Sequence, residues 1–231
     1  MKRYMCISIL AIISLTGILY DTSANTNTTS PKKYVALTFD DGPNENTTPL
    51  LLDILKTKHV HATFFVIGKN AQQYPDTLQR IYTEWHMRGN HTWDHITLPW
   101  LSTREVIIEV QKTQKTIKRI TGYTPIVVRP PYGAQNGKIL RILGGYHLAS
   151  LQWSVDSNDW QLPSSELLVQ EIMDKIQPWS IVLMHDTLTG TIQAMNSIID
   201  AIQDSGYTLV TVSELLWGIN NIHPGRIYRK Q

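Results

Sequence analysis

Short apolar runs alternate with helical patterns along most of this chain, and this alternation constrains the fold more than any other feature. Residues 34–39, 60–67 and 180–184 are apolar runs of strand length. Six or seven such runs, separated by helical patterns, lie between residues 34 and 212. Strands that alternate with helices form parallel βα units. The sequence therefore predicts one α/β domain built as a barrel, complete or one unit short.

Helices are predicted between these runs, of which three show the following signals. Ser102 and Glu105 have the spacing of a capping box, ahead of apolar residues at helical spacing. Residues 192–202 place isoleucine and methionine on one helical face before a glycine. A further helix is predicted over residues 75–88.

The bulk composition is that of a single folded domain. The chain has 231 residues, and its 42% hydrophobic content is enough for a sizeable core. A formal net charge of +2 is close to neutral, so it gives no reason to expect a nucleic-acid partner. The ten Tyr and seven Trp suit a sugar-binding cleft, but they are also ordinary core residues. We expect a monomer.

The N-terminus has the pattern of a secretory signal. Lys2 and Arg3 precede an uncharged, mostly apolar stretch over residues 5–20, and small residues follow at 22–24. We expect a secreted or cell-surface protein, with this segment either cleaved or kept as an anchor that would be its only contact with a membrane. The expected organisation is a signal segment 1–24, a linker 25–33, a domain 34–217 and a C-terminal tail 218–231 that forms a solvated end.

Five polar motifs lie at the ends of apolar runs. In order they are residues 38–43 (TFDDGP), 91–95 (HTWDH), 129–133 (RPPYG), 156–160 (DSNDW) and 183–186 (LMHD). In an α/β barrel, side chains at the carboxyl ends of the strands form the active site. Together the motifs supply a carboxylate pair, two histidines at a metal-binding spacing, an arginine and a further histidine. This inventory indicates a metal-assisted hydrolase.

His91 and His95 are four residues apart, so on a helical turn both rings would face one metal ion. Thr92 stands where zinc proteases of the HExxH type carry glutamate, so the general base must come from elsewhere. Asp40 is available as that base, and Asp41 offers a hard oxygen as a third ligand. The alternative interpretation is structural, because Asp-Asp-Gly-Pro is also good turn chemistry.

Arg129 precedes two prolines that stiffen the exit from its strand. Its charge could hold Asp40 ionised. The same stiff loop fixes the backbone N–H of Tyr132, which could stabilise an oxyanion. A surface arginine on a proline-rich loop is the plainer interpretation of this motif.

His185 ends an apolar run, where a lone histidine is more often a core residue than a catalyst. Asp186 and Asp156 are both candidate partners that would raise its pKa and orient its ring. A protonated imidazole could then give a proton to a leaving amine.

Over about residues 34–216 the five motifs resemble those of the polysaccharide deacetylase family. The resemblance implies a distorted (β/α)7 TIM-like barrel with one divalent metal ion, usually Zn²⁺, with Co²⁺ or Ni²⁺ as alternatives. It implies Asp41, His91 and His95 as metal ligands. It also implies Asp40 as general base, held by Arg129, and His185 as general acid, tuned by Asp156. The substrate-binding groups would be the Tyr132 backbone, Trp160 and Leu183, with Leu183 lining the acetyl pocket.

The family resemblance implies removal of N-acetyl groups from N-acetylglucosamine residues of a polysaccharide or oligosaccharide. Asn90 lies in a glycosylation sequon, and a glycan there would crowd His91. This favours export from a bacterium, with peptidoglycan as the first substrate and chito-oligosaccharide as the next. The alternatives are an O-acetyl xylan esterase, a non-sugar amidase, a glycosidase and a non-catalytic sugar-binding module. A glycosidase would not need the paired histidines, and a binding module would be expected to lose at least one motif.

Overall fold

A computed structural model describes residues 32–161, 164–217 and 222–228. The predicted signal segment 1–24 and most of the predicted linker lie outside the described residues. Lys33, the last residue of the predicted linker, is already the first residue of a strand.

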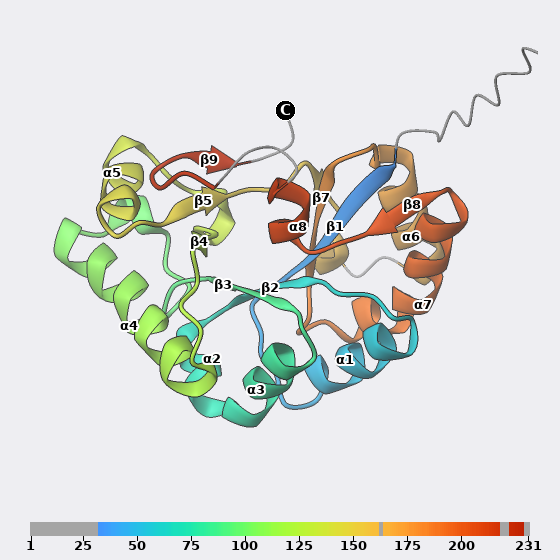
Figure 1. The fold of residues 1–231 in the computed structure, drawn as a ribbon, viewed down its shortest axis with the longest axis horizontal. Coiled ribbons are helices and arrows are strands. Elements are labelled where there is room, and N and C mark those ends of the chain that lie inside the picture. Colours follow the sequence, from blue (N-terminus) through green and yellow to red (C-terminus); the bar gives the residue numbers. More distant parts are fainter. Residues whose placement is uncertain (1–31, 162–163, 218–221, 229–231) are drawn as a thin grey trace, which may run out of the picture. The chain divides into compact units, whose positions relative to one another are not determined.

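A curled parallel sheet forms the centre of the described fold (Figure 1). Its strands are β1 (Lys33–Asp40), β2 (Thr63–Val66), β3 (Met87–Asn90), β4 (Val127–Val128), β5 (Ala149–Leu151), β6 (Val155–Asp156), β7 (Ser180–His185), β8 (Tyr207–Leu209) and β9 (Ile227–Tyr228). They are ordered β6-β7-β1-β2-β3-β4-β5-β9, and β8 pairs with the start of β1. No pairing joins β6 to β9 among the described strands. The predicted distorted α/β barrel is confirmed, with an open seam between these two strands.

The described helices are α1 (Thr48–Thr57), α2 (Gly68–Gln73), α3 (Pro75–Thr83), α4 (Thr103–Thr121), α5 (Gly137–Gly145), α6 (Ser165–Lys175), α7 (Thr189–Asp204) and α8 (Val212–Trp217), with short 3-10 turns η1 (Leu98–Trp100), η2 (Pro131–Gly133) and η3 (Asp159–Gln161). Helices α1 to α7 lie outside this sheet, whereas α8 lies within its curve (Figure 1) and packs on inward-facing residues of the strands. The predicted capping box is present: the Ser102 N–H donates to Glu105 Oε2 at 2.7 Å, and the Glu105 N–H donates to Ser102 Oγ at 3.3 Å. Among the described helices, none has both the length and the hydropathy required to cross a membrane.

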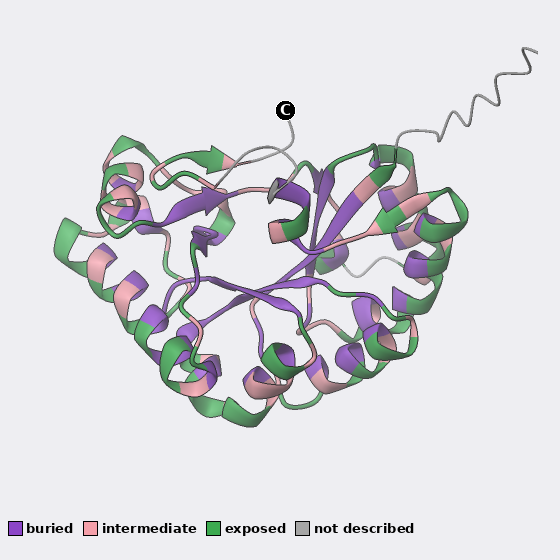
Figure 2. Cartoon of the chain, viewed as in Figure 1, coloured by how far each residue is buried: buried purple, intermediate pink, exposed green. Residues whose placement is uncertain are grey.

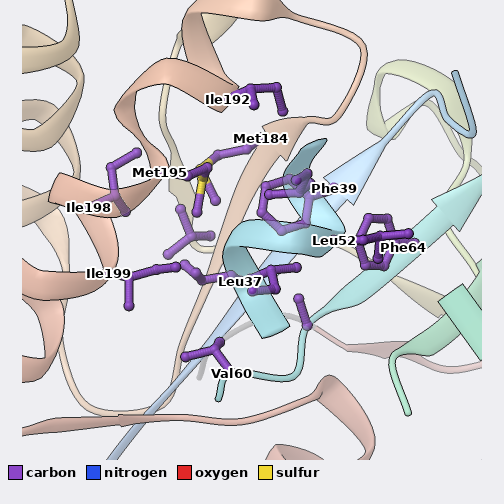
Figure 3. Packing of buried hydrophobic residues seen from close by; sticks show 14 of the residues in the cluster. Leu37, Phe39, Leu52, Val60, Phe64, Met184, Ile192, Met195, Ile198 and Ile199 are labelled. Carbon is purple, nitrogen blue, oxygen red and sulfur yellow. The ribbon is translucent and has the colours of Figure 1, made fainter. Parts of the chain in front are cut away.

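Alternate residues of β1 face two different layers, because side chains on a strand alternate between its faces. Leu37 and Phe39 pack against apolar residues of α1 and α7 in the outer core (Figure 3). Thr38 and Asp40 face the inside of the curled sheet, where both accept hydrogen bonds from Arg129. The central strands are accordingly buried on both faces, while exposed residues lie on helices, on loops and on the outlying strands β8 and β9 (Figure 2). The last inward side chain of β1 is thus a carboxylate at the carboxyl end of the sheet.

The predicted helix over residues 75–88 is too long, because α3 ends and β3 begins inside that range. Trp85 adopts a left-handed conformation (φ 64°), and the His86 N–H donates to the Ile81 carbonyl at 3.1 Å, so the chain turns away from the helix. β3 has the sequence MRGN, which lacks the β-branched residues that mark strands. Its pairing with β2 makes it a strand.

The described part of the predicted C-terminal tail, residues 222–228, is exposed or half-buried as expected of a solvated end, but it also contains a strand that was not predicted. β9 pairs in parallel with β5, and two hydrogen bonds flank the pairing: Ser150 N–H to Arg226 O at 2.8 Å, and Gln152 N–H to Tyr228 O at 2.7 Å. A two-residue strand is too short to show alternation. It forms because the outer edge of β5 offers unpaired backbone groups.

Candidate active site

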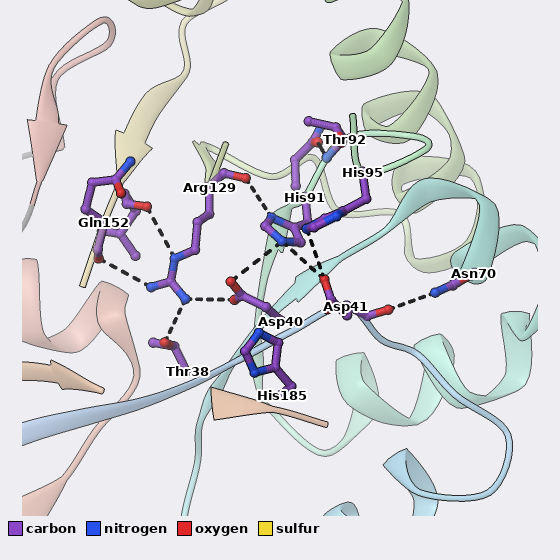
Figure 4. Close-up of polar contacts among 12 residues, drawn as sticks. Thr38, Asp40, Asp41, Asn70, His91, Thr92, His95, Arg129, Gln152 and His185 are labelled. Atoms are coloured by element: carbon purple, nitrogen blue, oxygen red, sulfur yellow. Dashed lines mark hydrogen bonds and ion pairs between the residues drawn. The ribbon is translucent and has the colours of Figure 1, made fainter. Parts of the chain in front are cut away.

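Side chains from the carboxyl ends of four strands meet in one cleft (Figure 4). Asp40 ends β1 and His185 ends β7, and these two residues are partners across the strand pair. His91 and Arg129 directly follow β3 and β4. The cleft has a volume of about 470 Å³ and is lined by Asp40, Asp41, His91, His95, Tyr132, Trp153, Asp156, Trp160, Leu183 and His185. Of the site residues that the family resemblance implies, only Arg129 is not in the lining, since it is fully buried and contacts Asp40. Trp153 is a lining residue that the sequence reasoning missed.

Asp41, His91 and His95 form a group that could hold a metal ion. Their ligand atoms lie within 4.8 Å of one another. Asp41 Oδ1 is 3.4 Å from His91 Nε2 and 3.3 Å from His95 Nε2. His91 Nδ1 lies 2.7 Å from the Arg129 carbonyl oxygen, so it carries the hydrogen and donates it, which leaves the Nε2 lone pair for the cation. Two imidazoles and one carboxylate, with further positions open, are a donor set typical of a catalytic zinc site.

The charges around this group favour a bound cation. Asp41 Oδ1 is buried and has no hydrogen-bond partner in the described structure. Burial alone would raise the pKa of Asp41, but the contact with His91 and the charges of the neighbouring histidines lower it to about 2. Burial would lower the pKa of His91, but Asp40 and Asp41 raise it above its usual value. Two carboxylates thus draw positive charge to the point where the three ligand atoms converge, and these residues fit a divalent ion.

The loop after β3, rather than a helical turn, brings His91 and His95 together. Thr92 and His95 have left-handed backbone angles (φ 66° and 58°), and the two rings lie 4.8 Å apart between centroids. The buried carboxylate of Glu109 on α4 accepts the backbone N–H groups of two loop residues, at 2.8 and 2.9 Å. The predicted convergence of the two rings is confirmed, but its predicted cause is wrong. Glu109 sits on an ordinary helical pattern, so nothing in the sequence singled it out.

Arg129 is fully buried and fixes Asp40. Its Nη1 donates to Asp40 Oδ1 at 2.7 Å and to Thr38 Oγ1 at 2.8 Å, and its plane lies 4.0 Å from the centroid of the Phe65 ring. Its Nε and Nη2 each donate to a backbone carbonyl oxygen at 3.3 Å. With one oxygen held by Arg129, the other oxygen of Asp40 lies 3.6 Å from His91 Nε2, beside the metal-binding group. The predicted contact between these two residues is confirmed.

Arg129→Met is expected to lower the free energy of unfolding by about 3–5 kcal/mol, because it leaves the buried Asp40 carboxylate without its partner. Urea denaturation followed by circular dichroism measures this change. Arg80→Met is the matched control, since the partly exposed Arg80 pairs with Asp53 and Glu84 at the surface. The control should cost about 1 kcal/mol or less. Equal losses in the two variants would contradict a special role for the buried pair.

The carboxylate that holds His185 belongs to Asp159. His185 Nδ1 donates to Asp159 Oδ1 at 2.7 Å, and the His185 backbone N–H donates to Asp159 Oδ2, also at 2.7 Å. Thr191 Oγ1 donates to the same Oδ2 at 2.7 Å. Burial lowers the pKa of His185, but the hydrogen bond and charge of Asp159, with Asp40 and Asp41 beyond, outweigh it and raise the pKa to about 9. His185 is therefore protonated at neutral pH, with Nε2 free to act as a donor.

The prediction that Asp156 tunes His185 is corrected by this geometry. Asp156 lines the cleft, but its Oδ1 accepts the Asn158 backbone N–H at 2.9 Å and closes a local turn. Asp186, the other predicted partner, is directed to Thr48 instead. Asp156 and Asp159 stand three residues apart in the same motif, and spacing alone could not rank them. The 3-10 turn η3 begins at Asp159 and contacts β7, which brings this second carboxylate to His185.

Aromatic and apolar groups complete the cleft. The Tyr132 ring is 70% exposed and makes an edge contact with His95 at 4.8 Å between centroids, and Trp160 is 58% exposed. Leu183 is buried below them in the lining. Gly133 has a left-handed φ of 65°, and a Cβ atom there would lie 3.1 Å from the Trp153 ring, so only glycine fits this bend. The site thus joins a charged floor to an exposed aromatic rim.

Comparisons with known proteins are consistent with this geometry. Residues 27–149 match the family model described as polysaccharide deacetylase. The chain is 40% identical over 183 residues to the peptidoglycan-N-acetylglucosamine deacetylase PgdA of Listeria monocytogenes, covering 79% of this chain and 39% of that relative. It is 34% identical over 196 residues to the chitooligosaccharide deacetylase of Azorhizobium caulinodans, covering 78% of this chain and 93% of that relative.

A solved structure shows the same fold. The T48 deacetylase with substrate aligns with a TM-score of 0.81 at 40% identity, over 85% of this chain and 96% of that one. The chain thus spans almost all of two of these proteins but only 39% of the length of the Listeria relative.

Proposed function

The chain belongs to the polysaccharide deacetylase family, and from this premise we propose that it is a metal-dependent hydrolase that removes N-acetyl groups from N-acetylglucosamine residues. The observation that carries the proposal is the placement of two different proton-transfer groups beside one metal-binding group. Asp40 and His185 end neighbouring strands and line the same cleft as Asp41, His91 and His95. Amide hydrolysis needs a base for the attacking water and an acid for the leaving amine.

Asp41, His91 and His95 would hold one divalent ion, for which zinc is the first candidate because the donors are two imidazoles and a carboxylate. When bound, such an ion polarises the acetyl carbonyl and lowers the pKa of water. The Arg129 carbonyl that accepts from His91 Nδ1 fixes the ring and its tautomer. The chain therefore supplies both the ligands and the contacts that orient them.

Asp40 would act as the general base. Arg129 holds one carboxylate oxygen at 2.7 Å, so the side chain has one orientation. The other oxygen lies beside His91 and lines the cleft, where it can accept a proton from water as that water attacks the carbonyl carbon. A carboxylate held in one orientation by a buried arginine is suited to this role.

His185 would act as the general acid. Its pKa of about 9 keeps the ring protonated, and Asp159 fixes Nδ1 so that Nε2 carries the proton to be donated. The proton would pass to the amine nitrogen as acetate leaves. The Tyr132 backbone N–H is proposed as the donor to the developing oxyanion. Trp160 and Leu183, which both line the cleft, are proposed to bind the sugar and the acetyl methyl group.

Peptidoglycan is the first proposed substrate, supported by the identity with the Listeria deacetylase. Chito-oligosaccharide is second, supported by the relative from Azorhizobium. An O-acetyl xylan ester or a non-sugar amide remains the alternative for the same site. We further propose that the protein is exported by its N-terminal segment, since its substrate would lie outside the cell.

The full chain is expected to release acetate from peptidoglycan or chitopentaose only when metal is present. Treatment with a chelator should remove nearly all activity, and added zinc should restore it, because the carbonyl would otherwise lack its electrophile. Coupled acetate assays on the two substrates measure both effects. Acetate release that persists after full metal removal would contradict the proposed mechanism. Zinc bound in equal molar amount with no acetate from either substrate would instead support the ester or the non-sugar amide.

A further inference from the structure

Asp186 is a buried acid that the proposed mechanism does not use. It follows His185 directly, is fully buried, and is absent from the residues that line the cleft. Its Oδ2 accepts a hydrogen bond from Thr48 Oγ1 at 2.6 Å, while Oδ1 has no partner in the described structure. Burying a carboxyl group is costly unless it is satisfied, so its position calls for an explanation.

The Thr48 hydroxyl connects Asp186 to the segment that carries the metal ligand Asp41. This segment, residues 41–47, is here called the ligand loop. Thr48 Oγ1 donates to Asp186 and accepts the Asn44 backbone N–H at 2.8 Å. Asn44 stands at the middle of the ligand loop, and its own side chain accepts two further N–H groups of the loop, at 2.8 and 3.2 Å. One hydroxyl therefore ties the loop to the end of β7.

Asp186 also packs directly against the backbone of the ligand loop. A Cβ atom at Gly42 would lie only 2.0 and 2.4 Å from the two carboxylate oxygens of Asp186, so any side chain there would force this carboxyl group to move. From the opposite direction, Asn70 Nδ2 donates to the Asp41 carbonyl at 2.7 Å. Asp41 itself has a left-handed backbone (φ 78°), a conformation that a non-glycine residue keeps only when its surroundings enforce it.

We propose that Asp186 is a positioning residue which, through Thr48 and by contact with Gly42, fixes the ligand loop and so places the Asp41 carboxylate for metal binding. The proposal rests on the proposed metal-dependent function. Since Asp186 is adjacent to His185 in sequence, the same turn of chain sets the proton donor on one side and braces the metal ligand on the other. Groups that orient metal ligands typically change metal affinity about 10–100-fold when they are removed.

Thr48→Val tests this proposal, because valine keeps the shape of threonine but removes the hydroxyl. We expect zinc affinity, measured by competition with a chromophoric chelator, to weaken by about 10–100-fold. Activity lost at limiting zinc should return at excess zinc. Thr48→Ser keeps the hydroxyl and should bind zinc as the wild type does. Gly42→Ala, which pushes the carboxyl group away without altering it, should weaken zinc binding like Thr48→Val.

The matched control is Thr57→Val on the same helix. The exposed Thr57 hydroxyl donates only to the Asp53 carbonyl of α1, so this change should leave zinc affinity unchanged. Thermal melts without metal confirm that each variant is folded at the assay temperature. A folded Thr48→Val protein with a lower melting temperature but wild-type zinc affinity would overturn the proposal and leave Asp186 a merely structural role. If the wild-type chain itself bound no zinc, the proposed function would fail instead.

Discussion

Asp40→Asn is expected to lower turnover by roughly 10²–10⁴-fold while zinc still binds as tightly as in the wild type. The amide can still accept the Arg129 hydrogen bond now made at 2.7 Å, so the fold around the site should be kept. It cannot take a proton from water, so the base is lost. Acetate release at saturating substrate and zinc measures turnover, and chelator competition measures zinc affinity.

Asp41→Asn is the contrasting variant for this test. Asp41 belongs to the metal-binding group, so its change should weaken zinc binding strongly, and excess zinc should recover part of the activity. Full retention of turnover in Asp40→Asn would remove Asp40 as the base. A loss of zinc binding in Asp40→Asn would show that Asp40 is itself a metal ligand. Its Oδ2 lies 3.6 Å from His91 Nε2, close enough to the metal-binding group for that result to be physically reasonable.

Asp159→Asn is expected to lower turnover by a similar factor, roughly 10²–10⁴-fold, and to move the alkaline limb of the pH–rate profile to lower pH. The hydrogen bond and charge of Asp159 raise the pKa of His185 to about 9 against the burial that lowers it. Without that carboxylate, burial dominates and the ring loses its proton earlier as the pH rises. The wild-type value of kcat/KM should fall above about pH 9, where His185 deprotonates. A profile over pH 5–10 for both proteins measures the shift.

Asp156→Asn is the matched control, because Asp156 lies in the same motif but its carboxylate accepts the local Asn158 N–H and makes no hydrogen bond to His185. Its alkaline limb should stay where the wild-type limb lies. A shift in Asp156→Asn with none in Asp159→Asn would restore the assignment made from the sequence.

The raised pKa of His185 also predicts that the stability of the fold depends on pH. The folded pKa of about 9 exceeds the ordinary 6.5, so the contact stabilises the fold fully below pH 6.5 and stops doing so as the pH rises through 9.

The carboxyl-end placement of the site could be predicted because it depends on local patterns. An apolar run followed by Asp40-Asp41, and another followed by His185, already place these side chains at strand ends. Parallel strands bring their carboxyl ends to one edge, so the convergence follows from the fold class. The ligand group, the contact of Arg129 with Asp40 and the lining residues Trp160 and Leu183 were all available from this reasoning and the family resemblance.

Where two identical side chains lie close together in the sequence, only the tertiary structure shows which of them makes a given contact. Asp156 and Asp159 are identical side chains three residues apart, and only the turn η3 against β7 brings the second one to His185. The ring pair of His91 and His95 converges through a left-handed loop held by Glu109, a residue in the middle of a distant helix. Spacing in sequence carries no information on such contacts, because they depend on where another element packs.

The strands β3 and β9 and the role of Asp186 show the same limit. β3 lacks β-branched residues and β9 is only two residues long, so neither shows a strand pattern, and each forms by pairing with a neighbouring strand. Asp186 stands beside His185 in the sequence, yet its carboxyl group lies under the ligand loop. The sequence by itself determined the α/β class and the inventory of chemical groups, because periodicity and strand-end motifs are local. The tertiary structure decided which groups touch, because hydrogen bonding and packing join residues that are more than a hundred positions apart, as Thr48 and Asp186 are.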